Sequence, residues 1–362
     1  MTDRGRQARL FVPGRLCLFG EHSDWAAELG RHPGYCLVIG TDQGLSAVAT
    51  PSEGFSVETI LPDPQGRPTG RTRRMSCPWD RQTLFSAARD EEEFFRYCAG
   101  VAGEIFGHPG VKGGVDLTIT AMDLPLRKGV SSSAAVCILV AQAFDAVYSL
   151  GLFPHEMMDL AYRGEKLTGS QCGRMDQACI YGKTPVLLTF RNGDVRVEPV
   201  FPEGTIHMLF VDLAGQKDTV RILTDLRAGY PHDPALREAL GRQNEQIVRR
   251  AHRALTAGDA RQLGALMTEA QERFDQDVAP ASADQLASPL LHEVLALDDV
   301  QPLVYGGKGV GSQGDGTAQL VARSEDARAR AAEVIEGAFP QMRCYPLTIL
   351  PLGHPRPSGS ES

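Results

Sequence analysis

The feature that most constrains the fold is the stretch from Ser131 to Gly151, which reads SSSAAVCILVAQAFDAVYSLG. Apolar residues cover nearly every side of a helix built from it, and such a helix is stable only when other elements surround it. Serines begin the stretch and Gly151 ends it, as is typical of helix ends. The chain is therefore predicted to bury a helix over 131–151.

Short apolar runs on either side of this helix are typical of strands. The runs RLFV, RLCLFG, YCLVIGT and LSAVAT predict a strand-rich beginning, and GVDLTIT at 114–120 alternates as a strand does. The pattern gives a strand-rich start, a helical middle and a mixed end. Further strands are predicted at 185–190, 195–200, 207–213, 317–322 and 344–350, helices at 155–168 and 324–337, and a mainly helical segment over 217–297.

Size and composition limit the number of domains and the class of protein. A chain of 362 residues exceeds what one hydrophobic core usually fills, so two domains are expected, with a boundary near residues 192–204. Hydrophobic residues make up 42% and charged residues 23%, which is ordinary for a globular protein. The formal net charge of -8, without a long block of Lys or Arg, argues against a nucleic-acid partner.

The sequence also bears on location and redox state. The first residues contain no apolar run of signal-peptide length, and nowhere do 18 apolar residues follow one another. A cytoplasmic protein without a membrane partner is therefore expected. The eight cysteines are scattered, form no C-x-x-C pair, and are predicted to be reduced and mostly buried thiols.

The segment LPLRKGVSSSAA, residues 124–135, places Gly129 and three serines where an extended segment turns into the buried helix. Backbone N–H groups at a helix start are unpaired and carry the positive end of the dipole, so they attract phosphate. Serine hydroxyls can add donors or one metal ligand. Taken alone, the segment is more simply a Ser N-cap on a core helix, but three serines exceed what one cap needs.

A second loop is predicted at YGGKGVGSQGDG, residues 305–316, whose six glycines allow a backbone to approach a ligand closely. Gly309, Gly311 and Gly314 satisfy G-x-G-x-x-G. A nicotinamide-dependent oxidoreductase is nevertheless disfavoured, because TAQLVA follows as a strand where that motif requires a helix. In isolation, a flexible surface loop explains the same residues.

Two acids stand where phosphate chemistry can use them. Glu165 in RGEKL and Asp176 in GRMDQ are 11 residues apart. A carboxylate beside a phosphate site can hold Mg²⁺ or accept a hydroxyl proton. Each acid alone is more often a surface charge or a helix cap.

The stretch PGRLCLFGEHSDW, residues 13–25, gathers Arg15, Glu21, His22 and Asp24 around an apolar run. Taken alone, Arg15 could equally be a salt-bridge partner, and His22 a structural histidine. Together with the serine loop and the glycine-rich loop, in this order, the stretch resembles the three motifs of the GHMP kinase family of small-molecule kinases. The opening motif and GRMDQ are most similar to those of galactokinases, so the resemblance implies a sugar kinase that uses ATP and Mg²⁺.

The resemblance implies a role for each matched residue. Asp176 would orient or deprotonate the attacking hydroxyl, and Arg15 would position and activate the same region. Glu21, His22 and Asp24 would contact the sugar. Metal ligands would be Ser133 and Glu165, and the nucleotide loop would comprise Lys128, Gly129, Val130, Ser131, Ser132, Ser133 and Ala134.

The resemblance also implies a two-domain α+β fold with the active-site cleft between the domains. The N-terminal domain, 1–198, would hold the phosphate-binding loop, and the C-terminal domain, 199–353, would be ferredoxin-like. Residues 354–362 have the composition of a disordered tail. The expected partners are a small-molecule sugar and ATP, and the chain would act as a monomer or homodimer.

Departures from the galactokinase pattern leave the sugar open. Cys17, Phe19 and Trp25 replace the usual Asn, Ile and Tyr, the passage after Trp25 is longer, and Asp315 interrupts the third motif. The expected reaction is phosphorylation of a free monosaccharide on its anomeric hydroxyl, with a uronic acid, pentose or deoxyhexose all open as substrates. The alternatives are a mevalonate-type alcohol kinase and a non-catalytic sugar or nucleotide sensor.

Overall fold

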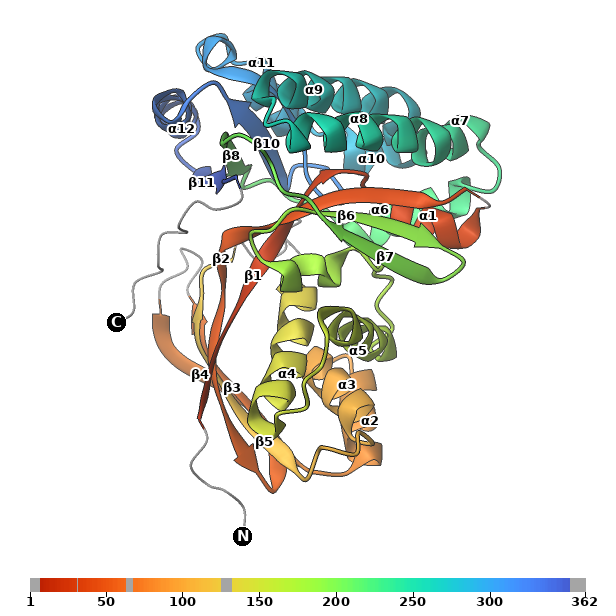
Figure 1. The fold of residues 1–362 in the computed structure, drawn as a ribbon, viewed down its shortest axis with the longest axis vertical. Helices are drawn as coiled ribbons and strands as arrows, with labels where there is room; N and C mark the ends of the chain where they lie inside the picture. Colours follow the sequence, from red (N-terminus) through yellow and green to blue (C-terminus); the bar gives the residue numbers. More distant parts are fainter. Residues whose placement is uncertain (1–6, 31, 63–67, 125–131, 352–362) are drawn as a thin grey trace. The chain divides into compact units, whose positions relative to one another are not determined.

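A computed structural model describes residues 7–30, 32–62, 68–124 and 132–351 of the chain (Figure 1). The chain forms two compact units, of which the first comprises residues 1–15 and 40–182 and the second residues 16–39 and 183–362. The chain thus enters the second unit at Leu16, returns to the first at Gly40, and leaves it after Gly182. The division into domains at residue 198 stays a prediction.

A twisted sheet forms one side of the first unit. Strand β3 (Gly54–Pro62) is antiparallel to β4 (Pro68–Pro78) and parallel to β5 (Gly114–Met122). The second half of β2 (Gly34–Ser52) is antiparallel to β5. RLFV and RLCLFG form one strand, β1 (Ala8–Phe19), and YCLVIGT and LSAVAT form β2, so the predicted strand-rich beginning is confirmed, although the four apolar runs make two long strands.

Glycines that read as strand breaks lie inside the long strands for reasons of packing. A Cβ atom on Gly44 would stand 2.5 Å from the carbonyl oxygen of Val12, which shows how closely the two backbones approach there. Glycine within a strand often marks such an approach. A pattern of residue types alone therefore made one continuous strand look like two.

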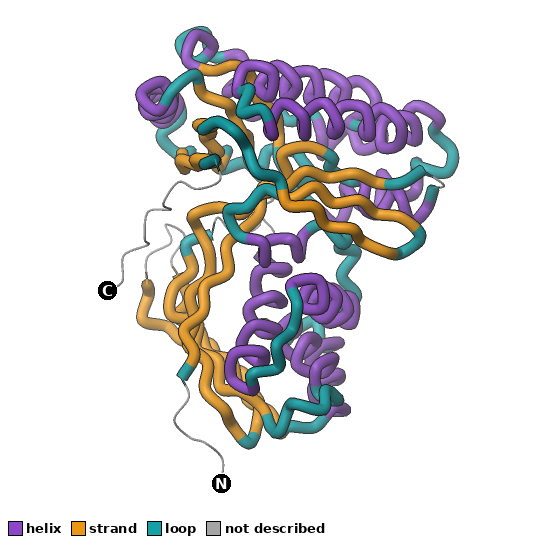
Figure 2. The backbone as a smooth tube through the Cα atoms, in the orientation of Figure 1, coloured by secondary structure: helices purple, strands orange, loops and turns teal. Residues whose placement is uncertain are grey.

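Helices pack beside this sheet within the first unit (Figure 2). The helix α4 (Ser132–Tyr148) confirms the predicted buried helix, although it ends before the predicted Gly151. Phe144 of α4 stacks on Phe55 of β3 with ring centroids 6.1 Å apart. Packed with α4 or beside it are α2 (Arg81–Arg89), α3 (Arg96–Ile105) and α5 (Pro154–Leu167), the last confirming the helix predicted at 155–168.

The second unit carries a four-stranded antiparallel sheet in the order β11-β8-β10-β9. Its strands are β8 (Ile206–Asp212), β9 (Val304–Gly309), β10 (Thr317–Ala322) and β11 (Arg343–Ile349). A helical region follows β8, and α12 (Glu325–Ala338) lies between β10 and β11 in the chain. This β-α-β-β-α-β order confirms the predicted ferredoxin-like part.

Helices cover this sheet and complete the unit. Helix α9 (Ala260–Asp277) packs on β9 and β10, and α12 packs on β8 and β11. Leu209, Leu320, Val294 and Ile335 are among the buried residues that form the core between strands and helices. The other α-helices and strands of the second unit are α1 (Ser23–Leu29), β6 (Val186–Arg191), β7 (Asp194–Pro199), α6 (Thr219–Gly229), α7 (Pro234–Glu238), α8 (Asn244–Thr256), α10 (Ala283–Leu286) and α11 (Pro289–Ala296).

The glycine-rich segment begins as a strand, so the prediction of a loop was wrong for residues 305–309, which belong to β9. A Cβ atom on Gly306 would stand 2.2 Å from the carbonyl oxygen of Gly264 in α9. A Cβ atom on Gly264 would stand 2.7 Å from the carbonyl carbon of Tyr305. These glycines therefore let a helix lie directly on a strand.

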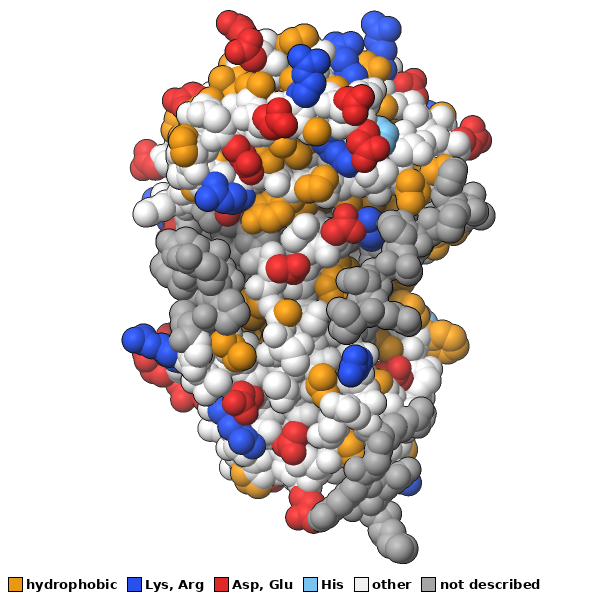
Figure 3. Space-filling view, turned by 90° about the vertical axis from the view of Figure 1, so that its left-hand side faces the viewer, with side chains coloured by type: hydrophobic (Ala, Val, Ile, Leu, Met, Phe, Trp, Pro, Cys, Tyr) orange, Lys and Arg blue, Asp and Glu red, His pale blue; other side chains and the backbone are white. Residues whose placement is uncertain are grey.

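Other expectations concern the surface and the thiols. Among the described residues no helix is both long and apolar enough to cross a membrane, and all eight cysteines are free, six of them buried. Arg71, Arg73 and Arg74 are exposed on β4, which lies at an edge of its sheet. On the face shown in Figure 3, basic and acidic side chains are interspersed rather than gathered into one patch.

Candidate active site

Arg15 and Asp176, 161 residues apart in sequence, meet in the first unit. Arg15 lies on β1, and Asp176 begins a short 3-10 helix, Asp176–Tyr181. The guanidinium Nε donates to Oδ1 of Asp176 at 3.1 Å, and Nη2 donates to the same oxygen. The Arg15 side chain is 4% exposed and that of Asp176 is 21% exposed. The carboxylate is therefore held on one side by a buried cation and is reachable from the other.

Glu165 of α5 is the buried acid of this region, with only 1% of its surface exposed. Gln177 Nε2 donates to its Oε2 at 3.0 Å, Ser170 Oγ donates to its Oε1 at 3.5 Å, and the Ser133 hydroxyl also donates to the carboxylate. Burial and the nearby charge of Asp176 nevertheless raise the pKa of Glu165 to about 7. A bound cation would favour the ionised form.

The two predicted metal ligands, Ser133 and Glu165, are thus in direct contact. The described residues contain no group of three or more His, Cys, Asp or Glu side chains arranged to hold a metal ion. Mg²⁺ prefers oxygen ligands and is usually bound by one or two carboxylates together with phosphate oxygens and waters. One carboxylate and one hydroxyl therefore fit Mg²⁺ that arrives with a nucleotide.

The predicted nucleotide loop is only partly covered by the structure. Ser132, Ser133 and Ala134 form the first turn of α4, and Ala134 is fully buried. Unpaired backbone N–H groups at a helix start suit phosphate. The other predicted loop residues, Lys128, Gly129, Val130 and Ser131, lie outside the described residues.

Glu21, His22 and Asp24 follow β1 in the second unit and are all buried. The turn that presents them begins at Gly20, whose φ of +100° is rarely adopted by other residues. A Cβ atom there would also stand 2.1 Å from the carbonyl oxygen of Tyr35. His22 itself has a left-handed φ of 66°, and Asp24 lies in the first turn of α1. Strained backbone of this kind is common at functional sites.

His22 is held as a neutral ring. Its Nδ1 accepts a hydrogen bond from Trp25 Nε1 at 3.1 Å, and the ring stacks on Phe274 with centroids 6.2 Å apart. Burial lowers the pKa of His22 to about 4, although a backbone hydrogen bond with Ser312 opposes the shift. At neutral pH the imidazole is therefore uncharged, and its two nitrogens can only accept or donate hydrogen bonds.

Glu21 forms an ion pair that the sequence analysis did not foresee. Its Oε1 accepts from Nζ of Lys308 on β9, whose side chain is 1% exposed, and the same ammonium donates to the Gly309 carbonyl at 2.7 Å. The Gly309 N–H in turn donates to Gln271 Oε1 at 2.7 Å. A single lysine within a run of glycines was the available signal for Lys308.

Gln177, which directly follows Asp176 and donates to Glu165, was not among the predicted site residues. Its position in GRMDQ was the available signal.

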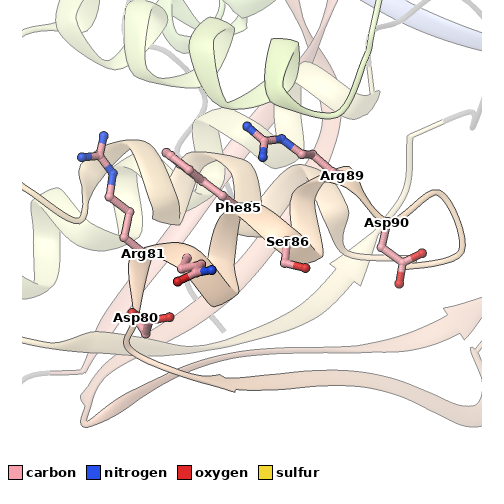
Figure 4. A pocket seen from close by; sticks show the side chains of 7 residues that line it. Asp80, Arg81, Phe85, Ser86, Arg89 and Asp90 are labelled. Atoms are coloured by element: carbon pink, nitrogen blue, oxygen red, sulfur yellow. The ribbon is translucent and has the colours of Figure 1, made fainter.

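A wider hollow lies on the exposed face of α2, where Arg81 and Arg89 both stack over Phe85, at 5.0 and 5.9 Å from the ring centroid (Figure 4). This hollow is formed by one helix and contains none of the described site residues.

Known proteins are similar to this chain in sequence. The family model for the N-terminal domain of GHMP kinases matches residues 92–183. A galactokinase of Chloroflexus aggregans is 25% identical over 366 aligned residues, which cover 90% of this chain and 86% of the relative. A galactokinase of Glaesserella parasuis is 24% identical and is covered, like this chain, to 75%.

Solved structures share the fold. The crystal structure of Lactococcus lactis galactokinase complexed with galactose matches with a TM-score of 0.73 and 18% identity, covering 96% of this chain and 95% of the other. The structure of L. major mevalonate kinase in complex with R-mevalonate matches with a TM-score of 0.71 and 19% identity, covering 97% and 99%. The mixed α+β architecture with two sheets is common to these proteins.

Proposed function

This chain belongs to the GHMP kinase family of phosphotransferases, and we propose that it transfers a phosphoryl group from ATP to the anomeric hydroxyl of a free monosaccharide. The observation that carries the proposal is the Arg15–Asp176 ion pair beside the buried Glu165. GHMP kinases use ATP. The choice of a sugar is supported by galactokinase relatives that align along most of the chain.

In this proposal Asp176 orients the attacking hydroxyl and accepts its proton. The partly exposed carboxylate can reach an acceptor while Arg15 fixes its orientation through two hydrogen bonds to one oxygen. Positioning and electrostatic stabilisation provide most of the rate in phosphoryl transfer, because the transition state needs little covalent help. In the same proposal the buried guanidinium would put positive charge near the negative charge of the transferred group.

Ser133 and Glu165 would hold Mg²⁺, and the first turn of α4 with the preceding residues 128–131 would bind the phosphates of ATP. When bound, ATP would supply the phosphoryl group and Mg²⁺ would neutralise the charge on its oxygens. The hydroxyl of Ser133 and the carboxylate of Glu165 are both hard oxygen ligands, which suits this cation. Glu21, His22 and Asp24 would contact the hydroxyl groups of the sugar.

The test is an acceptor panel of monosaccharides, uronic acids and mevalonate, with ADP release measured in a coupled assay and the product identified by NMR. We expect sugar-dependent ADP release and phosphate on C1. The Asp176→Asn variant should lose between about 10²- and 10⁴-fold in kcat while still binding ATP, because only proton acceptance is removed.

Two results would contradict the proposal. One is a folded, ATP-binding protein that releases no ADP with any sugar. The other is mevalonate turnover that exceeds sugar turnover and is unchanged by Asp24→Ala, since no sugar hydroxyl would then be recognised at Asp24.

A further inference from the structure

A cavity of about 50 Å³ lies within the second unit, beside the Glu21–Lys308 ion pair. Much of its wall is apolar and is formed by Phe19, Leu240, Ile247, Phe274 and Val278. Its polar lining includes Gln243 and Gln313 in addition to the ion pair. Ligand-binding sites commonly combine apolar walls with a few convergent polar groups.

Gln313 is 1% exposed, and neither Oε1 nor Nε2 of its amide has a hydrogen-bond partner among the described residues. Because both atoms are free, the observation does not depend on which is oxygen and which is nitrogen. Oε1 of Gln243 is also buried without a described partner. Three polar atoms from residues that line one cavity therefore have unmet hydrogen-bonding capacity, which buried polar groups rarely show.

Neighbouring glutamines make the contrast clear. Gln271 uses both ends of its amide, accepting from the Gly309 N–H at 2.7 Å and donating to Asp275 at 2.8 Å. Gln319 donates through Nε2 to the Cys17 carbonyl at 2.7 Å, so that only its Oε1 has no described partner. Gln313 lacks such a bond, and its backbone is left-handed, with a φ of 59°. Both features lower stability. Glutamine at this position is therefore better explained by binding to a ligand than by a contribution to the stability of the fold.

The charges around the cavity indicate what kind of group fits. The ammonium of Lys308 is already paired with Glu21, and Arg273, which also lines the cavity, is paired with Glu269 at 2.7 Å. The remaining capacity belongs to uncharged amides, which suit a group that both donates and accepts hydrogen bonds. A volume of about 50 Å³ accommodates a small substituent rather than a whole sugar ring.

We propose that this cavity receives one uncharged hydroxyl- or amide-bearing substituent of the acceptor sugar, and that Gln313 selects it. The inference rests on the proposed function, because Glu21, which borders the cavity, is one of the residues proposed to contact the sugar. It disfavours a uronic acid whose carboxylate enters this cavity. It also makes Gln313 a specificity-determining residue that the opening motif alone does not reveal.

The experiment compares wild type, Gln313→Met and the control Gln319→Met. Each accepted sugar is paired with its deoxy or deacetamido analogue, and kcat/KM is measured for both members of the pair. Wild type should prefer the substituted sugar of one pair, and Gln313→Met should reduce that preference by about 10- to 100-fold. The KM for ATP should not change. Gln319→Met should keep the preference, because Gln319 does not line the cavity.

A second measurement is independent of turnover. Without ligand, Gln313→Met should keep or raise the Tm, because it removes a partnerless buried amide, whereas Gln319→Met should lower the Tm by breaking its bond to Cys17. Calorimetric titration of the same sugar pairs, without ATP, gives the binding preference of each variant. A lowered Tm for Gln313→Met would mean that its amide already has structural partners, and would overturn the proposal.

The outcomes separate this inference from the proposed function. If no sugar is phosphorylated but wild type binds one member of a pair preferentially and Gln313→Met does not, the kinase proposal fails and the cavity assignment stands. If both proteins show the same preference, the assignment is overturned whatever the turnover. Absence of sugar binding to the wild type would overturn it as well.

Discussion

Glu165 combines almost complete burial with three hydrogen-bond donors, and the two influences act in opposite directions on its pKa. Burial and the charge of Asp176 prevail and raise the pKa to about 7, above the ordinary value near 4.5. Between these two values the folded protein binds more protons than the unfolded chain. Stability arising from this group is therefore fully present below about pH 4.5 and is lost as the pH rises through about 7.

We expect Glu165→Gln to remove this pH dependence, because the amide keeps the shape and carries no charge. Urea unfolding without ligand should show the variant more stable than wild type at pH 8 by an amount on the order of 3 kcal/mol, and nearly equal at pH 5. Added Mg²⁺ and ATP should stabilise wild type and leave the variant almost unaffected. The control is Glu104→Gln, which alters an ion pair with an exposed arginine, Arg163, and should change little. Equal stabilities of wild type and Glu165→Gln at pH 8 would contradict this account.

At the scale of elements, the contact of α9 with β9 depends on the absence of side chains at Gly264 and Gly306. The helix and the strand belong to the same ferredoxin-like part and approach closely enough for backbone atoms to touch. The same strand carries Lys308, so this packing also positions the partner of Glu21. Two glycines that are distant in the sequence, Gly264 and Gly306, thus serve packing and the site together.

Gly264→Ala is expected to destabilise the protein by about 1–3 kcal/mol, because the new methyl group would stand 2.5–3.0 Å from atoms of Tyr305 and Gly306. Gly337→Ala in α12 is the matched control, since nothing lies within 4 Å of a Cβ atom there. Alanine favours helix, so this control should be neutral or stabilising by up to about 1 kcal/mol. Urea unfolding measures both. Similar changes in the two variants would show that the α9–β9 contact is not tight.

At the scale of the whole molecule, the two units carry buried titratable groups with opposite effects. In the second unit burial lowers the pKa of His22 to about 4, so its contribution to stability is present above about pH 6.5 and is lost as the pH falls towards 4. In the first unit Glu165 contributes with the opposite sign. Acidification from pH 7.5 to pH 5 should therefore weaken the second unit and strengthen the first.

The two tryptophans can test this difference, because Trp25 lies in the second unit and Trp79 in the first. In Trp79→Phe the remaining tryptophan is Trp25, which is hydrogen-bonded to His22. In Trp25→Phe the remaining tryptophan is Trp79, which stacks on Phe144. On lowering the pH from 7.5 to 5, the urea midpoint reported by Trp25 should fall, and that reported by Trp79 should hold or rise. Midpoints that move together in both variants would mean that the units unfold in one step, and would refute the prediction.

Much of the architecture was readable from local patterns. The apolar run of α4, the alternation in β5 and the strand TAQLVA each specify an element through their own residues, and the structure confirms them. The long strand β2 was not readable as one element, because Gly44 reads as a break when seen alone. What makes it part of a strand is the backbone of Val12, which no window of sequence around Gly44 contains.

The sequence by itself determined which residues are candidates for the proposed phosphoryl transfer, because charge, hydrogen-bonding capacity and motif order are properties of the residues. The resemblance of the motifs to those of GHMP kinases implied the roles of Arg15, Asp176, Glu165 and Ser133. Only the tertiary structure decided which of them meet, and that Lys308 pairs with Glu21 across 287 positions of the chain. It also left the amide of Gln313 buried without a partner. The physical reason is that desolvation and pairing depend on neighbours in space, and those neighbours exist only after the sheets and helices have packed.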